Sequence, residues 1–435
     1  MKSRRRNKVF GAVFLFAMVA IVVVIVLRLN VSQTDDPPVS EGLPEVVIGL
    51  NDTTLSEIYE NGKEKIYPGN NLEIIADDTV LGFADVEIKG RGNATWLQPK
   101  KPLQFKLSQK VDLLGLGKHR KWILLANSMD YTNLRTDTAL YIEKMVGEKF
   151  AYQGKFVELY VDDSYEGLYY LTRGIGISKN AVDLRDPLGV LVELDNIYGE
   201  MENPYFVTSN GERLTIKDTV VDDNAEVAMA DFMESFNALE AAIKAQDYRK
   251  IKELIDVESF AQYYLISEMT ANPDAYFTSQ YFYKDGVEDK IHAGPAWDFD
   301  VSLNNYRVRG EFAPDGDLTH LGDNGYWGVD EQYLQWSRLY NRLMNFPEFR
   351  EEVNKVFQER LSGRKQELLK HVFQQAAKIY TAAMRDGERW GKEGYVGDVK
   401  RLLEWLDARY DYFEMKYGTK KHKNYPFYDI NVIET

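Results

Sequence analysis

The sequence predicts an α+β protein with a β-rich N-terminal half, a mainly helical C-terminal half and one transmembrane helix in front of them. Short segments with strand spacing run from residue 46 to about 221, helical spacing dominates from residue 222, and an uncharged segment lies near the N-terminus. Lobes of different composition commonly meet at a cleft that binds ligands. We therefore expect a β-rich lobe (46–221), a helical lobe (222–435) and a cleft between them.

The N-terminus has the features of a membrane anchor. Five of the first eight side chains are basic, and residues 9–27 carry no charge. At about 1.5 Å per residue such a segment spans a bilayer, and the basic flank favours the cytoplasmic side. A cleaved signal peptide is the alternative, but the apolar run ends in "VLRLNVSQ" rather than in small residues. The prediction is a cytoplasmic segment (1–8), a transmembrane signal anchor (9–28), a linker (29–45) and an extracellular domain (46–435).

Composition limits the classes of function. The 435 residues are 44% hydrophobic and 28% charged, which is typical of a globular protein. The formal charge is −15, and the basic N-terminus leaves the remainder near −20 (−15 − 5). Because nucleic-acid backbones require a basic face, we expect no nucleic-acid partner. The absence of cysteine excludes disulfides, cysteine nucleophiles and thiolate zinc sites.

The order of strand and helix patterns supports the two halves. The β-rich half is expected to contain the strands "EVVIGL", "LEIIA", "ADVEIKG", "LQFKLS", "KWILLAN" and "GVLVELDN". One helix is expected within 132–150, and a hairpin over 155–174 with its turn at Asp162, Asp163 and Ser164. Helices are expected over 224–245, 256–272 and 396–417, and a second hairpin within 279–300.

Common catalytic signatures are missing. The chain has no phosphate-binding Gly-x-x-x-x-Gly-Lys-Ser/Thr loop, no Gly-x-Ser-x-Gly elbow and no His-Glu-x-x-His pair. Its five histidines are scattered without ligand spacing. Three other constellations remain as candidates for chemistry.

The first constellation is basic and runs from Ile88 to Leu107, "IKGRGNATWLQPKKPLQFKL". Arg91 lies between glycines, so the backbone can approach a ligand while a guanidinium stays nearby. Lys101 precedes a proline, and Lys106 lies in mid-strand on the face opposite Phe105 and Leu107. These cations suit phosphate oxygens, but they equally suit a solvated strand edge that discourages pairing.

The second and third constellations are acidic. Asp274 follows Pro273 in a loop after an apolar helix, where a carboxylate can accept a proton from a hydroxyl or simply form a turn. In "GPAWDFD", Asp298 and Asp300 are two residues apart, so on an extended segment both point to one side. They can share a hard cation, or they can form an acidic strand end with Phe299 in the core.

The order of these parts is that of protein kinases, in which a basic hairpin precedes a catalytic-loop aspartate and a metal-binding aspartate. Asp274 and Asp298 are 24 residues apart (298 − 274), with a predicted hairpin between them. An ordinary kinase is excluded, because His-Arg-Asp, Asp-Phe-Gly and Ala-Pro-Glu are all missing.

The chain resembles the CotH family, the atypical protein kinases that are similar to spore coat protein H. The resemblance lies in "GRGNATW…KKPLQFKL", "KWILLANSMDYTNLR", "FVELYVDDSYEGLYYL", "GVLVELDN" and "GPAWDFD", in that order, and extends from about residue 46 through the C-terminal helices. It implies a divergent two-lobed kinase-like fold that uses ATP and Mg²⁺ or Mn²⁺ to phosphorylate serine in secreted or cell-surface proteins.

The resemblance also implies roles for individual residues. Asp274 corresponds to the catalytic-loop aspartate, and Asp298 to the metal-binding aspartate with Asp300 as its helper. Arg91, Lys101 and Lys106 correspond to the nucleotide-binding basic segment, with Lys106 on the phosphates. Trp297 is placed near the adenine or in the core.

Two further assignments are less direct. Ser279 and Gln280 lie where kinases hold a second metal-binding asparagine, and we assign Gln280 as that ligand. Glu143 is the candidate for the helix glutamate that pairs with the phosphate-binding lysine.

Two alternative functions stay open at this point. The segment "LTRGIGIS" stands where the family often has a Glu-Lys pair, which favours a surface binding or assembly module that has lost catalysis. A metal-dependent hydrolase that uses the same aspartates is the other. The leading prediction is a membrane-anchored extracellular kinase.

Overall fold

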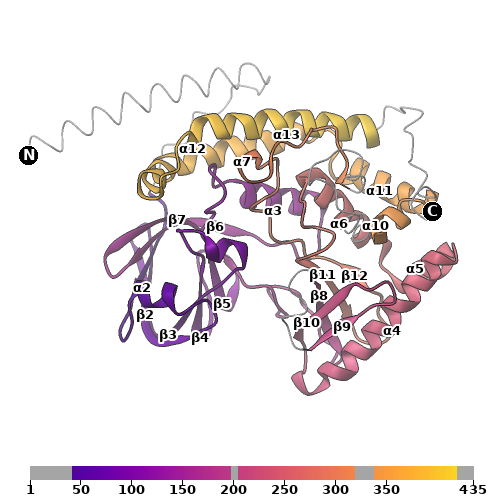
Figure 1. Ribbon diagram of the computed structural model, residues 1–435, viewed down its shortest axis with the longest axis horizontal. Coiled ribbons are helices and arrows are strands. Elements are labelled where there is room, and N and C mark those ends of the chain that lie inside the picture. The colour runs from indigo at the N-terminus through magenta and orange to yellow at the C-terminus, as the bar shows by residue number, and fades with distance from the viewer. Residues whose placement is uncertain (1–41, 197–203, 319–337, 419–435) are drawn as a thin grey trace, which may run out of the picture.

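A computed structural model describes residues 42–196, 204–318 and 338–418. These residues form a β-barrel, a second β-sheet and a layer of helices (Figure 1). The predicted cytoplasmic segment and membrane anchor lie outside the described residues. Within the described part of the chain, no helix is both long enough and apolar enough to cross a membrane.

The barrel is formed by the first seven strands. Its strand order is β1-β2-β3-β4-β5-β7-β6, and the parallel pairing of β1 with β6 closes it. All other neighbours in the barrel are antiparallel. The strands are β1 (Glu45–Gly49), β2 (Tyr67–Ala76), β3 (Thr79–Gly90), β4 (Leu103–Asp112), β5 (Lys118–Leu125), β6 (Gly154–Val161) and β7 (Ser164–Arg173).

Alternating side chains fill the barrel. In β4, Leu103, Phe105 and Leu107 point into its core, which leaves Lys106 on the outer face as the period of two requires. The predicted hairpin of β6 and β7 is confirmed. Its turn residues Asp162 and Asp163 have φ of 48° and 65°, which aspartate tolerates better than most residues and which suits a two-residue hairpin.

The second sheet has the order β12-β11-β8-β10-β9, and every pairing in it is antiparallel. Its strands are β8 (Gly189–Leu194), β9 (Tyr205–Val207), β10 (Arg213–Thr219), β11 (Gln280–Asp285) and β12 (His292–Ala293). Strand β8 lies in mid-sheet and is buried along its whole length. Strands from both sides of the predicted lobe boundary at residue 221 therefore share this sheet.

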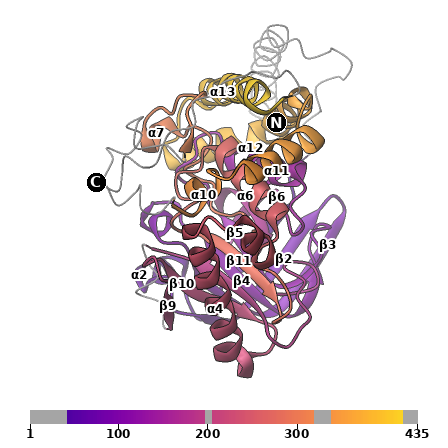
Figure 2. The ribbon, with the colours of Figure 1, turned by 90° about the vertical axis from the view of Figure 1, so that its right-hand side faces the viewer.

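Helices cover both β-structures. They are α2 (Leu55–Glu60), α3 (Arg135–Val146), α4 (Ala225–Lys244), α5 (Tyr248–Leu254), α6 (Val257–Thr270), α7 (Tyr306–Arg309), α10 (Arg338–Leu343), α11 (Pro347–Arg360), α12 (Lys365–Trp390) and α13 (Tyr395–Tyr417), with 3₁₀ turns at Ala94–Leu97 and Asp222–Asn224. Helix α4 packs on the second sheet, and α3 contacts α6, α11 and α12. Both ribbon views place α12 and α13 above the strands (Figures 1 and 2).

A buried ion cluster fastens the barrel to α12. Asp386 accepts hydrogen bonds from Lys100 Nζ at 2.6 Å, from Lys392 Nζ at 3.3 Å and from the Leu168 backbone N–H at 3.0 Å. Burial would raise the pKa of Asp386, but the two lysines outweigh that effect and hold the pKa below its usual value. Removing one partner of such a buried pair typically costs about 3–5 kcal/mol, so the cluster fixes how the barrel meets the helices.

The α+β class, the β-rich first half and the helical second half are confirmed. The closed barrel was not predicted. The period-two pattern identifies each strand, but it carries no signal for the pairing of β1 with β6, which joins Glu45 to Glu158.

Candidate active site

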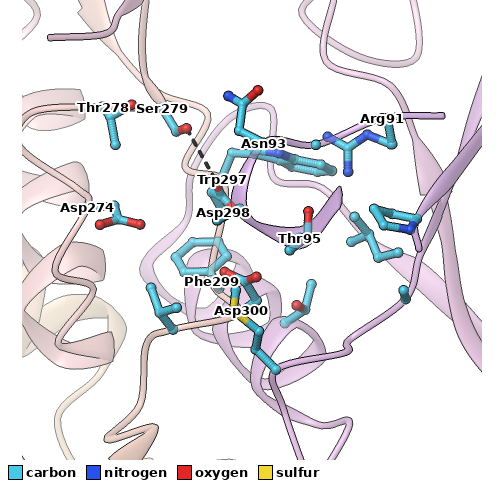
Figure 3. Close-up of a pocket in the computed structure, with 18 of the residues that line it drawn as sticks. Arg91, Asn93, Thr95, Asp274, Thr278, Ser279, Trp297, Asp298, Phe299 and Asp300 are labelled. Atoms are coloured by element: carbon cyan, nitrogen blue, oxygen red, sulfur yellow. Dashed lines mark hydrogen bonds between the residues drawn. The ribbon is translucent and has the colours of Figure 1, made fainter. Parts of the chain in front are cut away.

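A cavity of about 580 Å³ lies where the barrel meets the second sheet. Its charged lining residues are Lys63, Glu64, Lys89, Arg91, Glu193, Asp195, Lys217, Asp274, Asp298 and Asp300. Its apolar lining includes Leu125, Ala126, Met129, Leu140, Trp297, Phe299, Val301 and Val308. In the view of Figure 3, Asp298 and Asp300 lie between Asp274 and Arg91.

The loop after β3 places Arg91 in this cavity. The Arg91 backbone N–H donates to the Pro102 carbonyl at 3.3 Å. Gly90 must lack a side chain, because a Cβ there would lie 2.3 Å from the Trp96 ring, and Gly92 has a φ of 82° that favours glycine. The two glycines thus allow the tight turn that directs Arg91 inward.

Asp298 is held in an uncommon backbone conformation. Its φ is 67°, in the left-handed region that non-glycine residues rarely adopt. Its carbonyl accepts a hydrogen bond from Asn272 Nδ2 at 3.0 Å, and its carboxylate accepts one from Ser279 Oγ at 3.3 Å (Figure 3). The segment is therefore not the extended strand end that the sequence suggested, yet both Asp298 and Asp300 line the cavity.

Asp274 reaches the cavity from the loop after α6. Its backbone N–H donates to Asn272 Oδ1 at 3.2 Å, and its carbonyl accepts from Phe277 and Thr278. This is a turn, as the simpler interpretation of the sequence required. The turn nevertheless directs a half-buried carboxylate into the cavity, so the two interpretations are compatible.

Negative charge is concentrated around Asp298. Burial raises the pKa of Asp298, and the nearby Glu193 and Asp195 carboxylates act in the same direction, while Arg91 and Ser279 oppose them. Burial lowers the pKa of Arg91, against the attraction of Asp298. The guanidinium forms no hydrogen bond or ion pair with any described residue, so its donors remain available to an anion.

Trp297 combines the two roles that the sequence left open. It is 8% exposed and contacts the Tyr152 ring edge-on at 5.6 Å, as a core residue does. It also lines the cavity, and the Arg91 guanidinium carbon lies 5.9 Å from its ring centre.

Other predicted site residues do not line the cavity. Lys101 Nζ donates to the carbonyls of Trp96 at 2.5 Å and Gln98 at 3.1 Å. Lys106 pairs with Glu87 at 3.1 Å on the outer face of the barrel.

Gln280 is buried and donates to the Tyr340 hydroxyl at 3.2 Å, while Ser279 beside it faces the cavity. Glu143 is buried and accepts from the backbone N–H groups of Tyr152 and Ala296.

Sequence reasoning missed a polar cluster on the second sheet. Glu193 accepts from Lys217 Nζ at 2.5 Å and from the Tyr281 hydroxyl at 2.8 Å. Asp195 accepts from Thr278 Oγ1 at 2.8 Å. Glu193 and Asp195 lie two apart in "VELDN", which is the same signal that singled out Asp298 and Asp300 and could have revealed them.

The fold and the cavity define an α+β protein with a site in which cations and carboxylates face one space. A family model described as "CotH kinase protein" matches residues 86–413, which is most of the chain. The chain belongs to this family, and the resemblance predicted from its motifs is confirmed. The match includes every cavity-lining residue except Lys63 and Glu64. No curated protein matches the chain.

Proposed function

We propose that the protein is a kinase that transfers the γ-phosphoryl group of ATP to serine hydroxyls, with Mg²⁺ or Mn²⁺ as the cation. The observation that carries this proposal is the convergence of Arg91, Asp274, Asp298 and Asp300 on one cavity from three separate segments. Phosphoryl transfer demands positioning and charge stabilisation, and this cavity offers both.

The carboxylates fit a divalent cation. Asp298 and Asp300 supply hard oxygen ligands, and the carboxylates that crowd Asp298 make a positive charge favourable there. Among the residues that the structure describes, no group of three or more acidic or histidine side chains could hold a metal by itself. This fits Mg²⁺, which is commonly bound by one or two carboxylates with water and phosphate oxygens. A bound cation would neutralise phosphate charge.

The remaining residues have separate roles in the proposal. The serine oxygen bonds to the γ-phosphorus, the bond from that phosphorus to the β–γ bridging oxygen breaks, and ADP leaves. Asp274 accepts the serine proton. Arg91 and Lys217 bind phosphate oxygens, because both line the cavity, whereas Lys106 does not. Trp297 and the apolar wall of Leu125 and Met129 offer surfaces for the adenine.

The decisive experiment compares two aspartates that have nearly the same positive φ. Asp298 and Asp163 have φ of 67° and 65°, and asparagine tolerates this region, so Asp298→Asn and Asp163→Asn each remove one charge without new strain. The full-length chain in detergent is incubated with labelled ATP, Mg²⁺ or Mn²⁺ and a serine-rich acceptor. We expect transfer by the wild type, a loss of roughly 100-fold or more in Asp298→Asn, and no loss in Asp163→Asn.

Absence of transfer by the wild type, or equal transfer by the Asp298→Asn variant, would contradict the proposal. Metal-dependent nucleotide binding without transfer would favour the binding or assembly module instead. Release of phosphate without any acceptor would favour the hydrolase.

The membrane anchor belongs to the same proposal. The basic residues 1–8 and the uncharged residues 9–27 support a single-pass protein with its kinase domain outside the cell, where the acceptor is a secreted or cell-surface protein. We expect the chain in the membrane fraction and its C-terminal domain open to protease added to intact cells. If the domain were protected until the cells are lysed, the protein would have the opposite orientation in the membrane.

A further inference from the structure

One buried amide side chain joins the two catalytic segments. Asn272 is 3% exposed and lies just after the C-terminus of α6. Its Oδ1 accepts the backbone N–H of Asp274 at 3.2 Å, and its Nδ2 donates to the Asp298 carbonyl at 3.0 Å. A backbone N–H can only donate and a carbonyl can only accept, so the two partners fix the orientation of the amide without ambiguity.

The segments that Asn272 joins contain residues in strained backbone conformations. Ala271, Ser279 and Asp298 all have positive φ, at 44°, 51° and 67°. Each such non-glycine residue costs on the order of 1–3 kcal/mol unless its surroundings hold it. The bond from Ser279 reaches only the carboxylate of Asp298, whereas Asn272 binds its backbone. Asn272 is thus the side chain that ties the strained backbone of Asp298 to the Asp274 loop.

We propose that Asn272 is a positioning residue that sets the location of Asp298 relative to Asp274. The role in catalysis rests on the proposed kinase function, while the structural link does not. Asn272 does not line the cavity, so it acts through the two aspartates rather than on nucleotide or acceptor. Misplacement of a reacting group by about 1 Å can cost roughly 100-fold in rate, which makes such a tie consequential.

The proposal depends on the amide and not merely on a side chain of similar size. The ionised form of Asn272→Asp keeps an acceptor for the Asp274 N–H but has no donor for the Asp298 carbonyl. Asn272→Ala removes both bonds without burying a charge. The first variant should release only the Asp298 segment, and the second should release both.

The barrel supplies a matched control. Asn70 is also fully buried, donates through Nδ2 to the Tyr67 and Val86 carbonyls, and accepts the Asn51 N–H through Oδ1. Asn70→Ala and Asn70→Asp therefore remove the same kinds of bond at a residue that does not line the cavity. All variants are studied well below their own melting temperatures.

The first readout is hydrogen exchange of backbone amides, which needs neither metal nor activity. In Asn272→Ala we expect faster exchange in residues 274–279 and 297–303, and in Asn272→Asp only in 297–303. The Asn70 variants should loosen barrel strands alone. Equal exchange in the Asn272 and Asn70 variants would overturn the proposal, and if Asn272→Asp does not fold, the two alanine variants decide.

The second readout separates positioning from general damage. In Asn272→Ala we expect kcat to fall roughly 10- to 100-fold. We also expect weaker Mn²⁺ binding, measured by calorimetry in the presence of ADP, while KM for ATP at saturating Mn²⁺ stays near the wild-type value. If the kcat and the Mn²⁺ affinity of Asn272→Ala both equalled those of the wild type, the catalytic role would be refuted. Should the wild type transfer no phosphate, the exchange result still tests the link, so the two failures are distinguishable.

Discussion

Lys106 and Lys217 lie in different β-structures, and only Lys217 lines the cavity, which decides which of them can meet a nucleotide. Lys106 faces outward from the barrel, where its side chain is 43% exposed and pairs across strands with Glu87. Lys217 extends from β10 into the cavity and is anchored on the nearly buried Glu193. A cation held in place by a buried carboxylate is better prepared to receive phosphate than a mobile one.

Lys217→Met should therefore lower kcat/KM for ATP at least tenfold, or about 1.4 kcal/mol, because one phosphate donor is lost. Lys106→Met is the matched control and should change it less than about twofold, since it removes an exposed pair. Initial rates at varied ATP concentration give both values. A larger loss in Lys106→Met would restore the original assignment of that residue. In Lys217→Met the buried Glu193 loses its lysine but keeps its hydrogen bond from Tyr281, and melting curves check that the variant stays folded.

The acidic residues of the site could be predicted from sequence more fully than the basic ones. Asp274 and Asp298 were identified by their order and spacing relative to the basic segment and by the family resemblance, and both line the cavity. Lys106 was correctly placed on the face opposite Phe105 and Leu107. What the sequence could not show is which face of the barrel borders the cavity, since that depends on contacts between residues far apart in the chain.

Helix α3 ends in a segment that should make stability depend on pH. Gly147 caps the helix with a φ of 90°, and the next residue, Glu148, is 6% exposed. Burial raises the pKa of Glu148 to about 7, and Asp256 adds to this, while the Phe150 N–H and Lys149 oppose it. Glu143 on the same helix also has a raised pKa, because it is buried and lies near Glu148.

The direction in which stability changes with pH follows from proton binding. Between the usual pKa near 4.5 and the folded value of about 7, the folded protein holds more protons than the unfolded chain, so stability falls as pH rises through this window. Glu148→Gln removes the contribution of this carboxyl group. The fall in the free energy of unfolding between pH 5 and pH 8 should therefore be smaller in the variant by on the order of 2–3 kcal/mol. Urea denaturation at both pH values measures it. Glu359→Gln, at an exposed position of α11, should leave the decline unchanged; an unchanged decline in Glu148→Gln would contradict the expectation.

Individual elements were predictable where turn chemistry and periodicity agree. The β6–β7 hairpin has Asp162 and Asp163 at its turn, and α3 has Leu140, Ile142 and Met145 at helical spacing, so both were found, although α3 is buried over most of its surface. Strand β9 has only three residues and lies at the sheet edge, which leaves too short a pattern to detect.

At the scale of the whole molecule, the cavity is bounded by the barrel on one side and by the second sheet on the other. A nucleotide bound there would contact both. We therefore expect ADP with Mg²⁺ to raise the unfolding temperature of the domain, with a stabilisation of about 2.7 kcal/mol at a ligand concentration 100-fold above Kd.

Thermal unfolding with ADP and Mg²⁺, compared with ADP and EDTA, tests this expectation. The Lys217→Met variant should lose about half of the shift or more, because tenfold weaker binding removes about 1.4 kcal/mol of the stabilisation, and Lys106→Met should keep the shift. An equal shift with EDTA would show that the nucleotide binds without the cation, and no shift at all would remove the cavity from consideration as the nucleotide site.

The second sheet also sets the order in which the protein can be assembled. All seven barrel strands have been synthesised once Arg173 has left the ribosome. Strand β8 must wait for β11, because Val190 pairs with Lys284, and the cavity needs Asp300 as well. Pairings of such long range form late. A nascent chain stalled between residues 173 and 280 would therefore carry the complete barrel but would lack β11, Asp298 and Asp300, so the cavity cannot form until most of the C-terminal half has been made.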